Sequence, residues 1–148
     1  MRDINQLFKG QAGDTYELPD DERTLVRAAT LAARGADTTY IRFKVGAAIR
    51  LVEDVYMNNV ASELERNSRI VLGANTQFKT YEGAHAETMA LDRALMITRD
   101  FAATDGGARG IVSKIAVYSP DSSAPVPPCG GCRQRISELV YDPNFFSI

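Results

Sequence analysis

The sequence predicts a single α/β domain, and three observations lead to that prediction. Apolar stretches with strand character alternate along the chain with stretches of helical periodicity, as in α/β proteins. The chain has 148 residues, a length typical of one domain, and 45% of them are apolar, which is enough for a core. No internal repeat or interdomain linker interrupts the pattern. We therefore expect one domain over 1–148, with a polar N-terminal arm at 1–19.

The first expected helix covers residues 20–36, with the sequence DDERTLVRAATLAARGA. Asp20 can cap this helix, acidic residues fill its first turn, and Gly35 can end it. Its apolar residues recur at helical spacing and share one face, which we expect to be buried: Leu25, Ala28, Ala29 and Ala32.

Two strands are expected next, at 45–52 (VGAAIRLV) and 69–75 (RIVLGAN). The small residues of the first strand allow close packing. A long polar segment, 53–68, separates the two strands, whereas a simple hairpin needs only a few residues. We therefore predict that 53–68 is an insertion, with a short helix near 61–66.

The strongest helical pattern covers residues 84–98, AHAETMALDRALMIT. After it, 101–110 reads as a loop and 113–119 as a buried strand, which the proline- and serine-bearing segment 120–128 ends. The helical pattern predicts an apolar face made of Ala86, Met89, Ala90 and Ala94, widened by Leu91 and Leu95.

The C-terminal region predicts a short helix at 132–140 and a last short strand at 144–148. With helical spacing, the apolar residues of this helix fall on one side: Cys132, Ile136, Leu139 and Val140.

Charge and hydropathy indicate a small-molecule partner rather than a nucleic acid or a membrane. Lys and Arg number 17 against 19 acidic residues, a net charge of −2, so the composition supplies no basic face for phosphates. The first 20 residues lack the apolar core of a signal peptide, and no apolar run has membrane-spanning length. We expect a cytoplasmic protein whose cysteines stay reduced.

Two cysteines, Cys129 and Cys132, lie close together in the segment PPCGGC at 127–132, just before the last helix. A helix N-terminus carries partial positive charge and stabilises thiolates. This spacing suits a metal site, a dithiol redox pair or two buried inert thiols.

The number of available ligands favours a catalytic zinc site. The chain holds one histidine, His85, and two cysteines, Cys129 and Cys132. A closed structural zinc site needs four ligands, whereas three protein ligands and a water are typical of catalytic zinc, which lowers the pKa of that water to about 7. Glu87, in the same helix turn as His85, would take the proton from this water. The alternative is that Glu87 only complements the helix dipole.

The combined pattern is more specific than its parts. His85 and Glu87 form H-x-E, and 128–132 forms P-C-x-x-C, which together are the signature of zinc-dependent deaminases. The chain further resembles the cytidine deaminase family, including its blasticidin S deaminase branch. The resemblance covers about 22–148 outside the insertion, and its clearest segments are RFKVGAAI (42–49), GANTQF (73–78), GAHAETMAL (83–91) and PVPPCGGCRQRISEL (125–139).

The resemblance implies a fold, a cofactor and a reaction. The fold is a three-layer sandwich with a mixed sheet of about four to five strands and helices on both faces. Zinc is bound by His85, Cys129 and Cys132, zinc hydroxide attacks C4 of cytosine, and Glu87 is the proton shuttle. The expected partner is a nucleoside substrate in pyrimidine salvage, and the expected assembly is a homo-oligomer, a dimer or a tetramer.

The resemblance also assigns substrate contacts. Phe43 would pack on the base or sugar, the Ala86 backbone would hold the base carbonyl, and Asn75 would hydrogen-bond the ribose. Gln77 stands where the family has a ribose-binding glutamate, and Arg133 would moderate the charge of the thiolates. Other roles for these residue types are core packing for Phe43, a turn or cap for Asn75, and an exposed helix charge for Arg133.

The expected activity is hydrolysis of cytidine or deoxycytidine to the uracil nucleoside and ammonia. Three departures from the family pattern motivate an alternative substrate, a modified cytosine or aminonucleoside such as blasticidin S. These are Gln77, Lys44 in place of the usual proline, and an early C-terminus at Ile148. Two other classes of function are a non-catalytic zinc-binding module and a nucleic-acid editor. The charge balance disfavours the editor.

Overall fold

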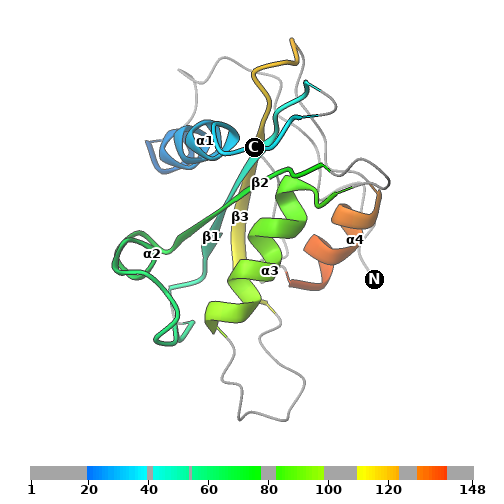
Figure 1. Ribbon diagram of the computed structural model, residues 1–148. Coiled ribbons are helices and arrows are strands. Elements are labelled where there is room, and N and C mark those ends of the chain that lie inside the picture. Colours follow the sequence, from blue (N-terminus) through cyan, green and yellow to red (C-terminus); the bar gives the residue numbers. More distant parts are fainter. Residues whose placement is uncertain are drawn as a thin grey trace.

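Helices and strands alternate along the chain, as the sequence predicts (Figure 1). The structure, a computed structural model, describes residues 20–39, 42–53, 55–77, 83–98, 110–123 and 130–139. In chain order, the elements of this part are α1 (Asp20–Ala33), β1 (Gly46–Leu51), α2 (Glu63–Ser68), β2 (Ile70–Ala74), α3 (Ala86–Thr98), β3 (Val112–Tyr118) and α4 (Gly130–Leu139). Among the described helices, none combines the length and apolar character that a membrane crossing requires.

The described strands form one sheet in the order β2-β1-β3, and both pairings are antiparallel. Gly46, the first residue of β1, pairs with Ala74 at the end of β2 and with Tyr118 at the end of β3. The segments that leave β2 and β3 therefore start at the same end of the sheet, beside the segment that enters β1.

The described sheet is smaller than expected and is not mixed. It has three strands instead of four to five, and no neighbouring pair in the described part is parallel. No parallel pair forms because β1 lies between β2 and β3. These two strands run in the same direction and are connected through α3. The expected arm at 1–19, the loop at 101–109 and the strand at 144–148 lie outside the described residues, as does Val140.

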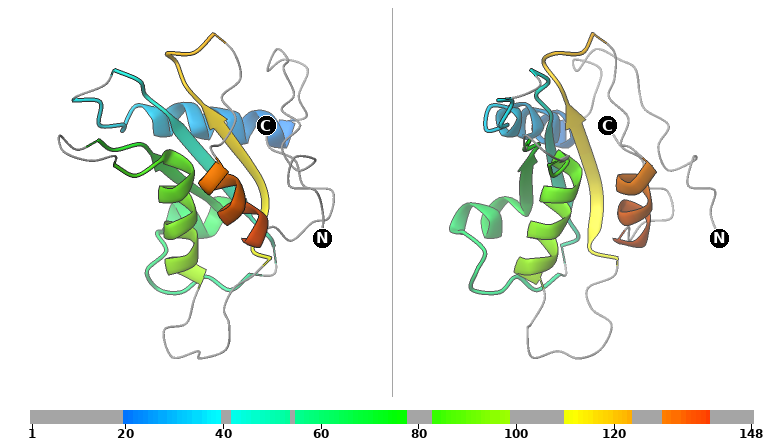
Figure 2. Two further views of the ribbon diagram at one scale, coloured as in Figure 1. Left: turned by 90° about the vertical axis from the view of Figure 1, so that its right-hand side faces the viewer. Right: turned by 45° about the vertical axis from the view of Figure 1, so that its right-hand side comes forward.

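Helices cover both faces of the sheet (Figure 2). Successive residues of β1 point to opposite faces, as in any strand. Ala48 packs with Leu25 of α1, whereas Ala47 and Ile49 belong to the core beneath α3. Ile136 of α4 joins that same core, and α4 lies beside α3. The expected three-layer α/β arrangement is therefore confirmed.

Close packing of α1 on β1 depends on a glycine. A Cβ atom at Gly46 would lie 2.1 Å from the carbonyl oxygen of Ala29 and 2.4 Å from the amide nitrogen of Ala33. Only glycine fits this contact, which confirms the prediction that small residues of the first strand allow close packing. The helix begins at Asp20, so this residue lies in the first turn, where it pairs with Arg23, rather than before it as a cap.

The acidic first turn of α1 also pairs with cations of the sheet. The Nζ atom of Lys114 lies 2.9 Å from the Glu22 carboxylate and 3.3 Å from the Asp21 carboxylate, which also pairs with Arg50. Burial lowers the pKa of Lys114, but the bonds to Glu22 and Asp21 outweigh it and leave that pKa above its usual value. Since Glu22 is buried, it depends on this lysine for compensation of its charge.

Replacing Lys114 with methionine is expected to lower the free energy of unfolding by about 2 kcal/mol, because Glu22 would remain buried without its partner. Chemical denaturation at neutral pH measures this change. Arg23→Met in α1, the helix that carries Glu22, is the control, because the pair of Arg23 with Asp20 is exposed and contributes little. Equal stability of the two variants would contradict the prediction.

The insertion between β1 and β2 is ordered against α3. Its helix α2 spans Glu63–Ser68, two residues later than predicted, because Ser62 serves as the N-cap: its hydroxyl accepts from the Glu65 amide, and the Glu65 carboxylate accepts from the Ser62 amide. Arg93 of α3 donates to the same carboxylate at 2.9 Å. The backbone amide of Asn58 donates to the Ile97 carbonyl at 2.7 Å. The insertion thus holds the C-terminal end of α3.

The buried face of α3 differs from the predicted one at two positions. Met89 was expected in the core but is 40% exposed, whereas Ile97 is fully buried. Ala86, Ala90, Ala94 and Ile97 recur at helical spacing and form one buried face, and Met89 lies outside it. Of the other expected core positions, Ala86, Ala90, Ala94 and Leu91 are buried, and Leu95 is partly buried.

Acid is expected to weaken the contact between the insertion and α3. Burial raises the pKa of Glu65, but bonds from Arg93 and Ser62 outweigh it and lower that pKa below its usual value. A depressed folded-state pKa stabilises the protein above the unfolded pKa, about 4.3. This stability is lost as the pH falls through the folded pKa. Unfolding of wild type and Glu65→Gln between pH 7 and pH 3 measures it, and the variant should lose less stability over this range.

Candidate metal centre

The residues that could bind a metal or transfer protons lie at the end of the sheet where β2 and β3 finish. The helices α3 and α4 both begin at this end and run side by side (Figures 1 and 2). His85 immediately precedes α3, Glu87 lies in its first turn, and Cys132 lies in the first turn of α4. The fold therefore brings Cys132 beside His85 and Glu87, which lie 47 and 45 residues earlier in the chain.

The start of α3 is fixed by the residues that follow β2. Thr76 donates its amide to the Ala84 carbonyl at 3.0 Å, and its hydroxyl accepts from the Ala84 amide at 3.1 Å. A Cβ atom at Gly83 would lie 1.9 Å from the Thr76 carbonyl oxygen, so only glycine fits there. The His85 carbonyl then accepts the Met89 amide and opens the helix. These contacts hold His85 at the helix entrance.

A second close approach presses α3 onto β2. A Cβ atom at Gly73 would lie 2.3 Å from the Ala86 carbonyl oxygen and 2.5 Å from the Ala90 amide nitrogen. Ala86 is fully buried as a result. The backbone of residue 86 is therefore rigidly placed beside His85 and Glu87.

The three side chains form a compact cluster. The Cys132 Sγ atom lies 3.4 Å from His85 Nδ1 and 3.4 Å from Glu87 Oε2, and the candidate ligand atoms of these residues lie within 4.8 Å of one another. Cys132 is 2% exposed and Glu87 is 4% exposed. The other predicted ligand, Cys129, lies outside the described residues, directly before Gly130, the first residue of α4 in the sequence.

The geometry and donor chemistry of the cluster fit zinc. Imidazole nitrogen and thiolate sulfur are its preferred protein donors, and with usual bond lengths at a tetrahedral angle the two atoms would be about 3.6 Å apart. The 3.4 Å between His85 Nδ1 and Cys132 Sγ is close to that separation. A buried carboxylate beside such a pair also suits a group that moves protons at the metal.

Helix α4 is anchored so that Cys132 points toward α3. Ile136 and Leu139 are buried in the core that α3 shares with the sheet. An ion pair between Arg135 and Asp92 joins the two helices on their exposed side. Arg133, which the resemblance places near the thiolates, is half-buried on α4 next to Cys132.

Asn75 organises the segment that enters β1. Its Oδ1 atom accepts from the Val45 amide at 2.9 Å, and its Nδ2 atom donates to the Phe43 carbonyl at 2.8 Å. Phe43 is 37% exposed, so the alternative that it belongs to the core is wrong. Gln77 is half-buried two residues beyond Asn75. These three residues lie at the same end of the sheet as the cluster.

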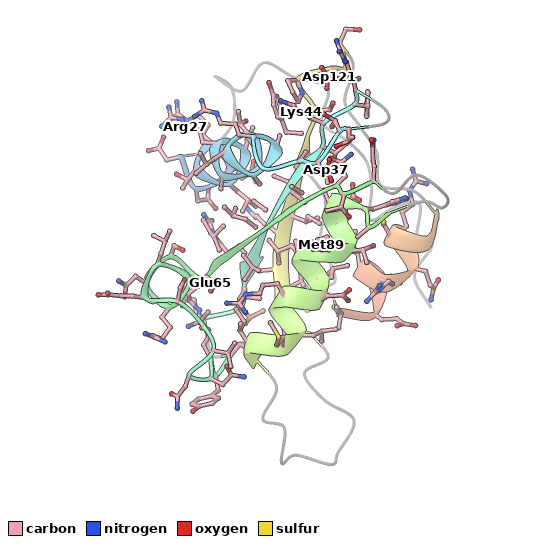
Figure 3. The ribbon with its side chains drawn as sticks, viewed as in Figure 1. Arg27, Asp37, Lys44, Glu65, Met89 and Asp121 are labelled. Atoms are coloured by element: carbon pink, nitrogen blue, oxygen red, sulfur yellow. The ribbon has the colours of Figure 1, made fainter. Side chains whose placement is uncertain are left out.

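Lys44 and Asp121 connect two segments at this end. The Lys44 backbone amide donates to the Asp121 carboxylate at 2.7 Å, and Figure 3 shows both residues at this end of the molecule. Bonds from the hydroxyl and the amide of Thr39 hold the pKa of Asp37 below its usual value. The Lys44 side chain is exposed.

Comparison with known proteins identifies the family of this chain. Residues 19–146 match the family described as the cytidine and deoxycytidylate deaminase zinc-binding region. The chain belongs to this family. The predicted family resemblance is thus confirmed, and the protein is a zinc-dependent hydrolase of the deaminase type.

Individual deaminases resemble the chain over most of its length. A cytidine deaminase of Halalkalibacterium halodurans is 35% identical over 120 residues, which are 80% of this chain and 72% of that protein. The crystal structure of a cytidine deaminase from Burkholderia pseudomallei gives a TM-score of 0.58 at 29% identity, covering 80% of this chain and 76% of that one. The crystal structure of cytidine deaminase from Mycobacterium tuberculosis gives a TM-score of 0.60 at 28% identity, covering 88% of this chain and 85% of that one.

Two residues that shape the cluster were not predicted from the sequence. Thr76 holds the start of α3, and the Thr88 Oγ1 atom lies 3.4 Å from Cys132 Sγ. A signal for Thr88 exists, because it follows His85 by three residues and so shares its helix face. The role of Thr76 depends on how the chain folds back after β2, for which the sequence pattern gives no signal.

Proposed function

We propose that this deaminase hydrolyses the exocyclic amine of a cytosine nucleoside, cytidine or deoxycytidine, to give the uracil nucleoside and ammonia. The observation that carries this proposal is the buried cluster of His85, Glu87 and Cys132 at the end of the sheet. A structural metal site has no use for a buried carboxylate beside its ligands, whereas a hydrolytic site needs one.

His85, Cys132 and Cys129 would hold zinc in this proposal. Zinc, when bound, would supply the Lewis acidity that makes water a nucleophile at neutral pH. The chain's own contribution is to keep this place dry and fixed, because Cys132 and Glu87 are both almost completely buried.

Glu87 would carry the protons of the reaction. Its carboxylate would accept one proton from water and deliver it to the ring nitrogen N3, and then carry a second to the leaving amino group. Water adds at C4, the C4–N bond breaks, and ammonia leaves. Glu87 lies in the first turn of α3, two residues after His85, so its carboxylate would stay within reach of the reacting atoms during both proton transfers.

The substrate contacts follow from the same placement. The rigid backbone at Ala86 would bind the base carbonyl, and the exposed ring of Phe43 would pack on the base or sugar. Asn75 and Gln77 would face the sugar, and Arg133 would moderate the charge of the thiolates. Since the Asn75 amide already holds the backbone at 43 and 45, it would place Phe43 as well as contact the sugar.

An aminonucleoside such as blasticidin S is the alternative substrate, and Gln77 favours it. An amide both donates and accepts hydrogen bonds, whereas a carboxylate only accepts, so Gln77 would suit a different partner from the family's glutamate. Ammonia release from cytidine, deoxycytidine and blasticidin S, with metal content measured on the same sample, tests the proposal. Turnover of blasticidin S without turnover of cytidine or deoxycytidine would contradict the proposed substrate. Light scattering would separately test the expected dimer or tetramer.

A further inference from the structure

Thr88 directs its hydroxyl away from its own helix. Thr24, Thr30 and Thr98, which also lie in helices, each donate to the carbonyl four residues earlier, at 2.9, 2.9 and 2.7 Å. Thr88 instead contacts the Cys132 sulfur across the gap between α3 and α4, at 3.4 Å. The same residue type therefore has a different partner at the metal centre.

The surroundings of Thr88 explain this choice. The residue four positions before it, Ala84, precedes the helix, unlike Asp20, Val26 and Ala94, and its carbonyl accepts the Thr76 amide at 3.0 Å. Thr88 also shares a helix face with His85, three residues earlier, and so points toward the metal ligands. The fold at the start of α3 thus favours a Thr88 hydroxyl that points away from its own helix and toward Cys132.

The direction of the hydrogen bond follows from the chemistry of the sulfur. The Cys132 thiol is directed at Glu87 Oε2 at 3.4 Å, which leaves its sulfur to accept. A cysteine that binds a metal is a thiolate and has no proton to donate. In the metal-bound protein, the Thr88 hydroxyl must therefore be the donor.

We propose that Thr88 is a positioning residue, whose hydroxyl donates to the Cys132 thiolate and strengthens retention of zinc. This inference rests on the proposed function, because it takes Cys132 as a zinc ligand. Outer hydrogen bonds to metal ligands typically change metal affinity about 10- to 100-fold. Thr88 does so without adding charge next to Glu87.

Zinc affinity of four proteins tests the proposal by competition with a chromophoric chelator. We compare wild type, Thr88→Val, which keeps the shape but loses the hydroxyl, Thr88→Ser, which keeps the hydroxyl, and the control Thr98→Val on the same helix. Thr88→Val should bind zinc about 10-fold more weakly, while the other variants remain near wild type. In the cobalt-loaded Thr88→Val protein, the thiolate-to-cobalt charge-transfer band should move to lower energy, because the sulfur loses a hydrogen bond.

Three results would overturn the role of Thr88: unchanged affinity and cobalt band in Thr88→Val, a loss that Thr88→Ser does not restore, or an equal loss in Thr98→Val. Thermal unfolding of the zinc-free variants separates a general loss of folding from a loss of metal binding. A wild-type protein that binds zinc but deaminates no cytosine nucleoside would contradict the proposed function, yet the comparison of affinities would still decide the role of Thr88.

Discussion

Glu87→Gln is expected to lower the turnover of a cytosine nucleoside by at least about 10³-fold while zinc stays bound. Glutamine has nearly the shape of glutamate but cannot accept a proton from water and pass it on. The buried position of Glu87 gives water little access to replace it. Steady-state ammonia release and zinc content of the same preparation measure the two effects.

Glu63→Gln is the matched control, because Glu63 is an exposed first-turn acid of α2 in the insertion. It should retain wild-type turnover. If Glu87→Gln retained turnover within a few-fold of this control, Glu87 would be no more than an acid that complements its helix. If zinc were lost together with activity, the carboxylate would instead act as a ligand.

Cys132→Ala is expected to lose both the metal and the activity. A catalytic site with three protein ligands cannot replace a thiolate, so zinc content should fall from about one per chain to a small fraction. The Cys132 sulfur lies 3.4 Å from His85 Nδ1, and alanine would remove this neighbouring donor from the histidine. Elemental analysis after dialysis measures the loss, and added zinc should not restore turnover.

Ser137→Ala, on the same helix, serves as its control, because within the described part of the chain the Ser137 hydroxyl donates to the nearby Gln134 carbonyl. Both variants should keep their helical content by circular dichroism. A Cys132→Ala protein that kept one zinc per chain would show that other residues hold the metal.

The arrangement of the elements was predictable because the local signals are strong. Leu25 and Ala29 recur at helical spacing, and 45–52 and 113–119 are short apolar runs, so α1, β1 and β3 appear within a few residues of their expected positions. The expectation that His85, Glu87 and Cys132 share one site rested on a different signal: the chain has one histidine and two cysteines, and their spacing is specific.

The differences from prediction arise from contacts between distant segments. Met89 fits the apolar pattern of its helix but lies outside the face that the packed helix buries, which includes Ala90, Ala94 and Ile97. The partners of Thr76, Thr88 and Asn75 are set by the packing of α3 and by the return of the chain beside β1. Sequence spacing describes neighbours within one helix or strand and carries no information on these partners.

The hold of the insertion on the far end of α3 has a consequence for the whole helix. Its 13 residues span about 20 Å, with Thr76 and Gly83 fixing the entrance and Asn58 and Glu65 the exit. A helix secured at both ends frays at neither, so α3 should open only together with the insertion, as one cooperative unit. Amide protons of α3 would then exchange with solvent at nearly one common rate, and shortening 55–68 would speed exchange even at the turn that carries Glu87.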